Sequence, residues 1–517
     1  MKNFFGVMFT FLFSLTSHAV GSKTYSYDKY LSELKAAPIA GDNEYPFFDE
    51  KAAAMLKPKL NIEAQRKIAQ ASELSEKSMS TEAQKIIQEI SDIDSTDNNT
   101  NAAEELHDLI QNYSKPKKYS ALPTDAQLII AQLASLSPFR GILWRIRPYF
   151  EKARITHTAA LTAFKNLAAN LRWSLRSPQT KLAFRYISEP YTEISEVPAV
   201  IDTDAKFYTW LLNDVNPHLQ TAAKRLNAIP IDSAKPLVWD NRILLGPNTF
   251  KDGIDRFKWV GEVERMMLVA SYENSISQIY FFGSYSNHKF IELAKELGKL
   301  FGVDSLPLPF MEVQGVTLKQ YREVIKNSDF QNFGTRLSTC TYSDKPCMEL
   351  SYNYLLSATE RMYAAWKTAQ KREGNNIYAF NTNFAQVDIA RGDINFENIR
   401  SLVKQRTMLR SLATGEPAEF DLPAFYKTPP QDLKKLLPTG FDEKKERTKT
   451  LKVGATSKTE SYRNYFYGSP QTWNHIEEYK TFLPKVASSD DILQAGRVLT
   501  HATFGLVRIP GLNLAEQ

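Results

Sequence analysis

The chain has 517 residues, of which 43% are hydrophobic, 64 are basic and 58 are acidic. The apolar fraction is ample for buried cores in roughly two to four domains. The formal net charge of +6 is small for this length, so the charge balance by itself implies no nucleic-acid partner.

Residues 1–19 have the pattern of a secretory signal peptide. Lys2 precedes an uncharged apolar run from Phe4 to Leu15, and the small residues Ser17 and Ala19 follow it. The run is about twelve residues long, whereas a membrane-spanning helix needs about twenty. We therefore expect cleavage after Ala19 and export to the periplasm or the exterior. An uncleaved anchor is the alternative interpretation.

No transmembrane span is expected after signal removal. Charged and amide side chains interrupt the later apolar windows, as Glu273 and Asn274 do between Met266 and Gly283, and such groups are costly in hydrocarbon. Export also makes a nucleic-acid partner the weakest choice.

Residues 20–120 are predicted to form an irregular lead-in and an acidic helical arm. From Ile62 to Ile110 the chain has eleven acidic and four basic side chains, a net charge of −7. Residues 62–93 favour helix but contain few strongly apolar side chains. This composition indicates a mobile arm or a weakly packed pair of helices.

Polar residues from Asp97 to Asp108 have part of the spacing of a calcium loop. Ala102 occupies the position of the invariant glycine, and Asp108 replaces the bidentate glutamate. We favour a polar hinge, in which Asn101 caps the next helix and Glu104 completes a capping box. No metal site is predicted.

Residues 121–330 are predicted to form a helical domain with a basic face. Capping and proline signals predict three helices, over residues 124–136, 137–147 and 151–176. Ten basic side chains and one acidic side chain lie between Arg140 and Arg185, a net charge of +9. The candidate binding residues are the cations on the second and third helices: Arg140, Arg145, Arg147, Arg154, Lys165, Arg172 and Arg176.

Two interpretations of these cations stay open. Clustered cations attract anions, so the basic face could dock an anionic envelope component or an acidic protein surface. Alternatively, the acidic arm folds back over the cations, or they simply solvate a helix face. The docking interpretation requires that the guanidinium groups face outward and are not neutralised by the chain's own carboxylates.

Further along this domain, the pattern predicts a short strand within residues 238–245 and a helix from about 255 to 282. Glu262 and Glu264 point to different sides of that helix, so they cannot flank one bond as the carboxyl pair of a glycoside hydrolase does. Glu262 and Arg265 are predicted to form a surface ion pair.

Residues 331–415 are predicted to form a hairpin followed by a helical unit. The segment between Cys340 and Cys347 contains the turn sequence SDKP, so a disulfide should join the two arms. A redox or metal role for the pair is a minor alternative, since the spacing is not C-x-x-C. The helix over 350–371 should bury an aromatic and aliphatic stripe, formed by Tyr352, Leu355, Leu356, Met362, Tyr363 and Trp366.

Residues 416–470 contain prolines, a mixed charge run and few apolar side chains, which indicates an extended loop or linker. Residues 471–517 are predicted to form a C-terminal helical tail. The fold class is therefore mainly α, an irregular multi-helix assembly with one disulfide-tied hairpin and a long late loop. A solenoid-like arrangement stays open because no repeat period is clear.

No motif that fixes a reaction is present. The chain has no H-E-x-x-H, G-x-S-x-G, G-x-x-x-x-G-K or G-x-G-x-x-G, and no cofactor is predicted. We therefore expect an exported, non-catalytic envelope-associated binding or scaffold protein. The alternative is a cell-envelope hydrolase whose site is assembled from residues distant in sequence.

Overall fold

The architecture is described from a computed structural model of the chain. It describes residues 26–36, 76–95, 101–146, 181–188, 200–231, 236–240, 256–289, 323, 330–338, 340–342, 345–372, 378–380, 386–412, 414–437, 439–441, 447–453, 456–462, 471–503 and 507.

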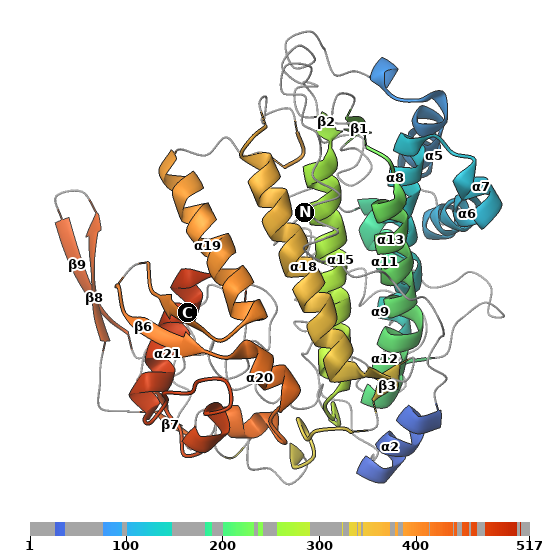
Figure 1. Cartoon of the computed structure of the whole chain (residues 1–517). Helices are drawn as coiled ribbons and strands as arrows, with labels where there is room; N and C mark the ends of the chain where they lie inside the picture. Colours follow the sequence, from blue (N-terminus) through green and yellow to red (C-terminus); the bar gives the residue numbers. More distant parts are fainter. Residues whose placement is uncertain are drawn as a thin grey trace.

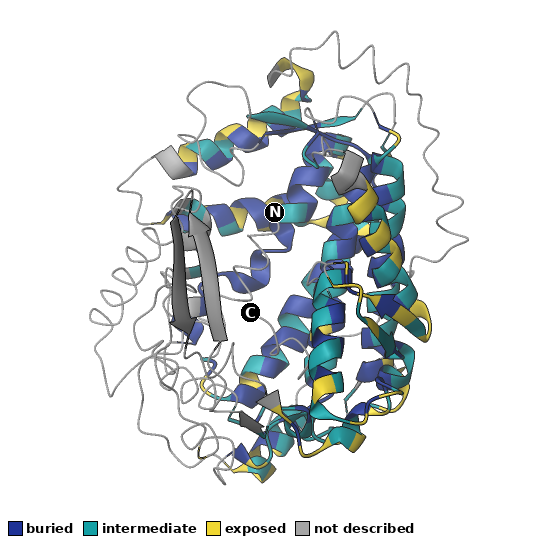
Figure 2. Ribbon diagram, turned by 90° about the vertical axis from the view of Figure 1, so that its left-hand side faces the viewer, coloured by how far each residue is buried: buried dark blue, intermediate teal, exposed yellow. Residues whose placement is uncertain are grey.

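Two long antiparallel helices form the centre of the molecule, α15 (Glu262–Gly283) and α18 (Cys347–Ala369) (Figure 1). Side chains of α15 are buried almost all round, as expected for a helix with neighbours on several sides. Figure 2 shows buried positions along the interior helices, with exposed positions gathered on outer helices and at chain turns. The mainly helical prediction is confirmed, whereas a solenoid-like stacking stays a prediction.

The N-terminal half of the described chain packs against one side of this pair (Figure 1). Its helices are α2 (Tyr27–Ala36), α5 (Thr81–Ser95), α6 (Ala102–Ser114), α7 (Pro116–Ser120), α8 (Thr124–Ala134), α9 (Ile142–Arg145), α11 (Lys181–Ser188), α12 (Asp204–Trp210) and α13 (Asn216–Ala228). Short 3-10 turns lie at η1 (Glu76–Ser78) and η2 (Ser137–Phe139).

The C-terminal part forms a second apolar core on the other side of the pair. Its helical elements are α19 (Gln386–Lys404), α20 (Leu422–Lys427), η7 (Leu433–Leu436), η8 (Ile476–Tyr479) and α21 (Ser489–Ala502). Tyr352, Leu355 and Leu356 of α18 pack against this core while Tyr354 belongs to the first, so α18 joins the two.

The sheets formed by the described residues each have two strands, which are antiparallel. They pair β1 (Leu237–Asp240) with β2 (Phe257–Val260), β3 (Thr341–Tyr342) with β4 (Lys345–Pro346), β5 (Thr407–Arg410) with β6 (Pro417–Phe420), β7 (Gly440–Phe441) with β10 (Gln471–Thr472), and β8 (Arg447–Val453) with β9 (Thr456–Tyr462). β1 confirms the strand predicted in this region.

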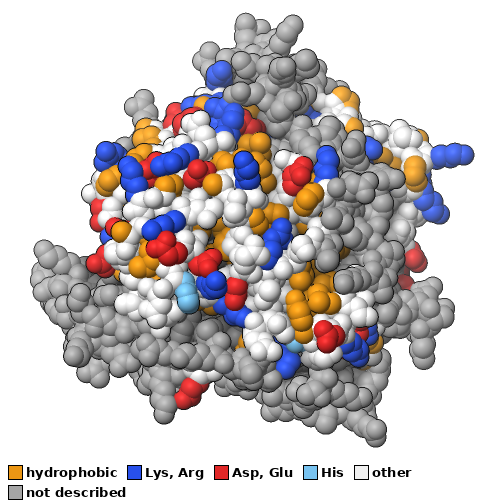
Figure 3. Space-filling model, turned by 60° about the horizontal axis from the view of Figure 1, so that its bottom comes forward, with side chains coloured by type: hydrophobic (Ala, Val, Ile, Leu, Met, Phe, Trp, Pro, Cys, Tyr) orange, Lys and Arg blue, Asp and Glu red, His pale blue; other side chains and the backbone are white. Residues whose placement is uncertain are grey.

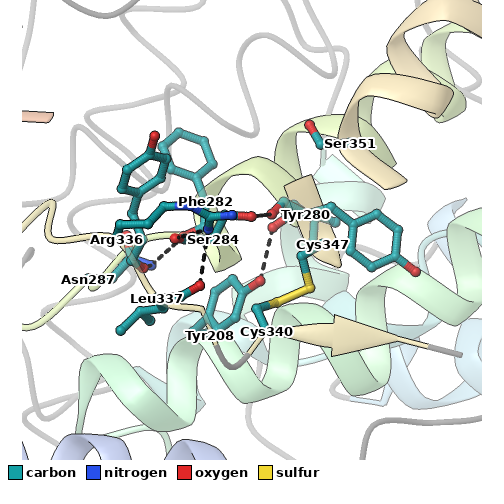
Figure 4. Close-up of a disulfide and its surroundings, with 12 residues drawn as sticks. Tyr208, Tyr280, Phe282, Ser284, Asn287, Arg336, Leu337, Cys340, Cys347 and Ser351 are labelled. Carbon is teal, nitrogen blue, oxygen red and sulfur yellow. Dashed lines mark hydrogen bonds between the residues drawn. A yellow bond between two sulfur atoms is a disulfide. The ribbon is translucent and has the colours of Figure 1, made fainter. Parts of the chain in front are cut away.

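The disulfide between Cys340 and Cys347 is present and closes the β3–β4 hairpin at the start of α18 (Figure 4). Just before the hairpin, the Leu337 N–H donates to the Ser284 carbonyl, and the Arg336 guanidinium donates to the same oxygen at 2.6 Å. The chain that enters α18 is thereby fixed to the end of α15.

A π-helical turn, η5 (Leu211–Val215), lies between α12 and α13, and the three elements run on without a break. Pro217 explains it, because proline has no N–H to donate and its ring clashes with the carbonyl four residues earlier, at Asn213. The wider π turn relieves that clash. His218 Nδ1 lies 2.6 Å from the Asp214 carbonyl oxygen, so its ring takes up a backbone acceptor beside the irregular turn.

Predictions for four segments are wrong. The helix predicted from about residue 255 begins only at Glu262, because Phe257–Val260 form β2. The helices α5 and α6 bury Ile86, Ile87 and Ile110 in the main core instead of forming a weakly packed arm. The stretch predicted as a single helix over 137–147 is split, because Gly141 adopts a left-handed conformation (φ 61°) between η2 and α9. The chain after residue 416 is also not one extended loop, since Phe420 and the helices α20 and η7 belong to the second core.

Among the described residues, no helix is long and apolar enough to span a membrane. The helix predicted over 151–176 lies outside the described residues.

Candidate functional site

A row of buried polar side chains lies between α15 and α18. We call this row the polar seam and define it as Glu273, Ser277, Ser351, Ser357 and Arg361. Ser277 Oγ donates to the Ser351 carbonyl at 2.7 Å, and Ser351 Oγ donates to the Ser277 carbonyl at 2.8 Å. This reciprocal pair lets the two helices approach closely at one level.

Further along the polar seam, Glu273 and Arg361 form a fully buried ion pair. Arg361 Nη2 lies 3.1 Å from Glu273 Oε1, and Ser357 Oγ donates to the same carboxylate oxygen at 2.9 Å. Arg361 Nη1 donates to Asn227 Oδ1 on α13 at 3.0 Å. Because buried charges are costly unless they are paired and hydrogen-bonded, this closed arrangement is suited to holding three helices together.

A second buried carboxylate lies at the start of α15. Arg372 Nη1 lies 2.9 Å from both oxygens of Glu264, whose carboxylate also accepts from the Gly261 and Phe380 N–H groups. The Arg372 guanidinium stacks on the Tyr378 ring at 3.7 Å. Burial raises the pKa of Glu264, while the Arg372 charge opposes that increase. Glu264 thus caps the helix and anchors the chain after α18.

The neighbouring residues Glu262 and Arg265 do pair, but the pair is largely buried and not on the surface as predicted. Their side chains are 10% and 5% exposed, and Arg265 also donates to the Asn227 carbonyl. On the other side of α18, the Glu360 carboxylate forms ion pairs with two cations of α19. Arg400 Nε lies 3.0 Å and Lys404 Nζ lies 3.1 Å from its oxygens. Glu360 therefore joins α18 to α19, whereas Glu262 pairs within α15, and each carboxylate has a cationic partner.

A serine–histidine pair lies in the C-terminal core, between the β5–β6 turn and α21. Ser411 Oγ lies 2.7 Å from His501 Nδ1, although the two residues are 90 positions apart. Ser411 Oγ also accepts from the Thr414 N–H at 3.0 Å, and Ser411 is only 3% exposed. A buried hydroxyl that closes a turn is poorly placed to attack a substrate, so this geometry is better suited to fixing the hairpin on α21.

Glu416 lies in the same turn and pairs with Arg497 of α21 at 3.0 Å. Hydrogen bonding from Arg497 and Thr414 lowers the pKa of Glu416. Its carboxylate is therefore directed to the arginine and the threonine of the turn.

The structure places two of the predicted cationic binding residues inside the protein. Arg140 is 2% exposed, and its guanidinium lies 6.0 Å from the Tyr186 ring. Arg145 is 9% exposed and lies 3.8 Å from the Asp214 carboxylate. The expectation that these two guanidinium groups face outward is corrected by their burial. The other predicted cations lie outside the described residues: Arg147, Arg154, Lys165, Arg172 and Arg176.

Three lysines that the sequence analysis passed over lie together at the surface. Lys115 and Lys117 are exposed, Lys118 is half-buried, and all three belong to α7 or directly precede it. The signal for them is the run SKPKKYS, which lies in a stretch from Leu109 to Thr124 without a carboxylate. We call Lys115, Lys117 and Lys118 the lysine ridge.

Elsewhere the described surface is electrically mixed. Figure 3 shows lysine and arginine side chains interspersed with aspartate and glutamate on one face, with no broad field of either sign. Within the described ranges, no group of three histidine, cysteine, aspartate or glutamate side chains could hold a metal ion. Asn101 stands at the N-cap of α6 as predicted, but its side chain makes no capping hydrogen bond, so the predicted capping box is not formed.

No protein-family model, no curated protein and no solved structure matches this chain.

Proposed function

We propose that the protein is an exported, non-catalytic binding or scaffold protein that docks an anionic envelope surface or an acidic partner protein through exposed cations. One observation carries the proposal. The buried carboxylates Glu264, Glu273 and Glu360 each have a cation from another element, whereas the lysines of the ridge make no ion pair within the described chain.

This division separates two uses of charge. The buried ion pairs contribute to the architecture, because the carboxylates of Glu264, Glu273 and Glu360 are each directed to a cation of the protein. The exposed lysines can contribute to an electrostatic attraction that acts over about 8–10 Å at physiological salt. The proposal also includes the other predicted cations, which lie outside the described residues: Arg147, Arg154, Lys165, Arg172 and Arg176.

Export is supported by the signal-like start of the chain and by the disulfide, which persists in oxidising compartments. Cell fractionation with an antibody to the C-terminal part tests it. The protein should appear, shortened at its N-terminus, in the periplasmic or secreted fraction. Recovery of an uncleaved chain in the cytoplasm would contradict the proposal.

Pull-down from envelope extracts tests the docking. We expect recovery of envelope material at low salt and a strong loss at high salt, because screening weakens interactions between exposed charges. Recovery that does not change with salt would contradict an electrostatic docking function. Bovine serum albumin coupled at the same density serves as a control for non-specific adsorption.

The pairing of Ser411 with His501 favours a second candidate, a hydrolase with a site assembled from distant residues. A fluorophosphonate probe, which labels activated serines, tests it on the intact protein. We expect no labelling, because Ser411 is buried and its Oγ accepts a hydrogen bond from the Thr414 N–H. Labelling that disappears in both S411A and H501A would favour the hydrolase over the binding protein.

A further inference from the structure

The lysine ridge lies on α7 and its N-cap residue, at the outer edge of the molecule (Figure 1). α7 begins with Pro116, whose fixed φ favours the first turn of a helix, and α6 ends directly before it. Arg225 of α13 donates to the Ser114 carbonyl at 2.7 Å, and its guanidinium stacks on the Tyr119 ring at 4.3 Å. The ridge is therefore held at both ends by contacts to a core helix.

The charge of the ridge is available for an external partner. Among the described residues, no carboxylate lies within ion-pair distance of Lys115, Lys117 or Lys118. Lys118 Nζ lies 3.9 Å from the centre of the Tyr113 ring. Glu89 accepts from the Tyr113 hydroxyl at 3.4 Å, and Glu82 of the same helix, α5, also interacts with that hydroxyl. These two carboxylates offset part of the charge of Lys118.

The chemistry of the ridge narrows the kind of partner. Lysine ammonium groups act as mobile point charges, whereas arginine provides the planar fork that fits a fixed carboxylate or phosphate. The exposed neighbours of the ridge are the small or polar residues Gln111, Asn112, Pro116 and Ser120. Protein interfaces depend on buried aromatic or apolar anchors, and the exposed large apolar residues of the described chain, Ile394, Met408 and Leu412, belong to the C-terminal part.

We propose that the lysine ridge is a docking surface for the anionic phospholipid headgroups of a bilayer. This inference rests on the proposed electrostatic docking function and specifies its surface and partner. A fluid bilayer can gather mobile phosphate headgroups beside the lysine ridge, so the ridge needs neither a pocket nor an apolar anchor to bind it. Lysines next to an anionic bilayer attract it additively and act within a Debye length of it.

Vesicle sedimentation with the intact mature chain tests the inference. Vesicles of phosphatidylglycerol with phosphatidylcholine are compared with vesicles of phosphatidylcholine alone, at low and high salt. The wild type should bind the anionic vesicles at low salt only. The variant K115Q/K117Q/K118Q should bind them on the order of 100-fold more weakly, since each lysine near an anionic bilayer contributes about a factor of five.

A matched variant controls for net charge. K345Q/K371Q/K427Q removes three other exposed lysines that make no ion pair within the described chain, and it should bind like the wild type. Equal weakening by both triple variants would overturn the ridge as the docking surface, because binding would then follow net charge alone. Circular dichroism confirms that both variants are folded.

The remaining outcomes separate this inference from the proposed function. Undiminished vesicle binding by K115Q/K117Q/K118Q overturns the ridge and moves the docking to other cations. Absence of vesicle binding by the wild type, together with salt-sensitive capture of an acidic protein, overturns the lipid partner and leaves the function standing. Absence of both vesicle binding and salt-sensitive capture overturns both.

Discussion

Arg361 and Glu273 form an ion pair across the two central helices in which the side chains are 1% and 0% exposed. The pair is joined by Ser357 from α18 and by Asn227 from α13, so that three helices meet at one carboxylate and one guanidinium. If the two helices were shifted along each other, Glu273 or Arg361 would face a hydrophobic residue of the other helix instead of its counterion. The pair therefore specifies how the central helices are aligned.

Removal of one partner should be strongly destabilising. We expect E273A or R361A to lower the free energy of unfolding by about 3–5 kcal/mol, because the remaining charge is left buried without its counterion. Urea denaturation followed by circular dichroism measures this. The double variant E273L/R361M removes both charges, and it should recover most of the lost stability.

The exposed pair of Glu477 and Lys480 provides the comparison. Its side chains are 79% and 49% exposed at a separation of 2.9 Å. Solvent screens such pairs, so E477A should change stability by less than about 1 kcal/mol. A loss in E273A no larger than that in E477A would refute the importance of the buried pair.

The disulfide should contribute modestly. The loop between Cys340 and Cys347 is short, and closing it restricts the unfolded chain by about 2 kcal/mol on the entropic estimate. We expect C340A/C347A to lose about that much stability in urea denaturation. Reductant should destabilise the wild type by a similar amount and leave the variant unchanged. An equal effect of reductant on both proteins would contradict the assignment.

The sequence predicts best those features that depend on neighbouring residues. Turn residues and helical periodicity predict the disulfide hairpin and the helix found at α18. The predicted C-terminal helical tail is only partly helical, since β10 and η8 precede α21. Capping shows the limit of such signals: the sequence favours Thr124 as the N-cap of this helix, but α8 begins at Thr124 and its N-cap position is occupied by Pro123.

The sequence predicts least well the burial of charged residues. On α18 we expected an aromatic and aliphatic stripe to form the buried face, but Tyr352, Leu355 and Met362 are only partly buried. The most buried residues include Ser357, Glu360 and Arg361 instead. Glu273, the counterion of Arg361, lies 88 residues away, so no local pattern reveals that a charged face is the internal one.

The same limit explains the candidate binding residues. Arginines are rarely buried without a partner, so a pattern of alternating cations and aromatics indicates a surface. Arg145 is instead buried beside Asp214 and the Trp210 ring, both of which come from a later helix. The sequence pattern does not single out Lys115 and Lys117, because the five residues of α7 are too few to show a helical period.

His107 should make stability depend on pH. Its Nδ1 lies 2.8 Å from the Tyr186 hydroxyl, and its pKa is lowered by burial first and by the Arg140 charge second, against the opposing charges of Asp108 and Glu104. In the unfolded chain the imidazole of His107 binds a proton at about pH 6.5. In the folded chain its lowered pKa means that protonation requires a lower pH. Stability should fall as the pH drops below about 6.5, until the lowered folded pKa is passed.

Urea denaturation of the wild type and H107Q at several pH values measures this contribution. Glutamine keeps a hydrogen-bonding group but does not titrate, so the stability of H107Q should depend less on pH between about pH 7.5 and 5. Identical pH dependence of the two proteins would refute a titrating role for His107.

Asp491 should stabilise the start of α21 as a charged cap. Its Oδ2 accepts from the N–H groups of Ala487 and Ser488, both at 2.9 Å, and Ser488 Oγ accepts from the Asp491 N–H at 3.3 Å. The N–H of Ala487, with the Ser488 groups, lowers the pKa of Asp491. The stabilisation is therefore present above the unfolded pKa of about 3.9 and is lost as the pH falls through the lowered folded pKa.

We expect D491N to be less stable than the wild type by about 1 kcal/mol at pH 7, the usual value for a lost cap. The difference should vanish in acid, where the wild-type carboxyl is also protonated. D490N removes the same charge from the same helical turn, but Asp490 is exposed. Because both variants weaken the interaction with the helix dipole equally, an effect of D490N as large as that of D491N would assign the stabilisation to the dipole and not to the cap.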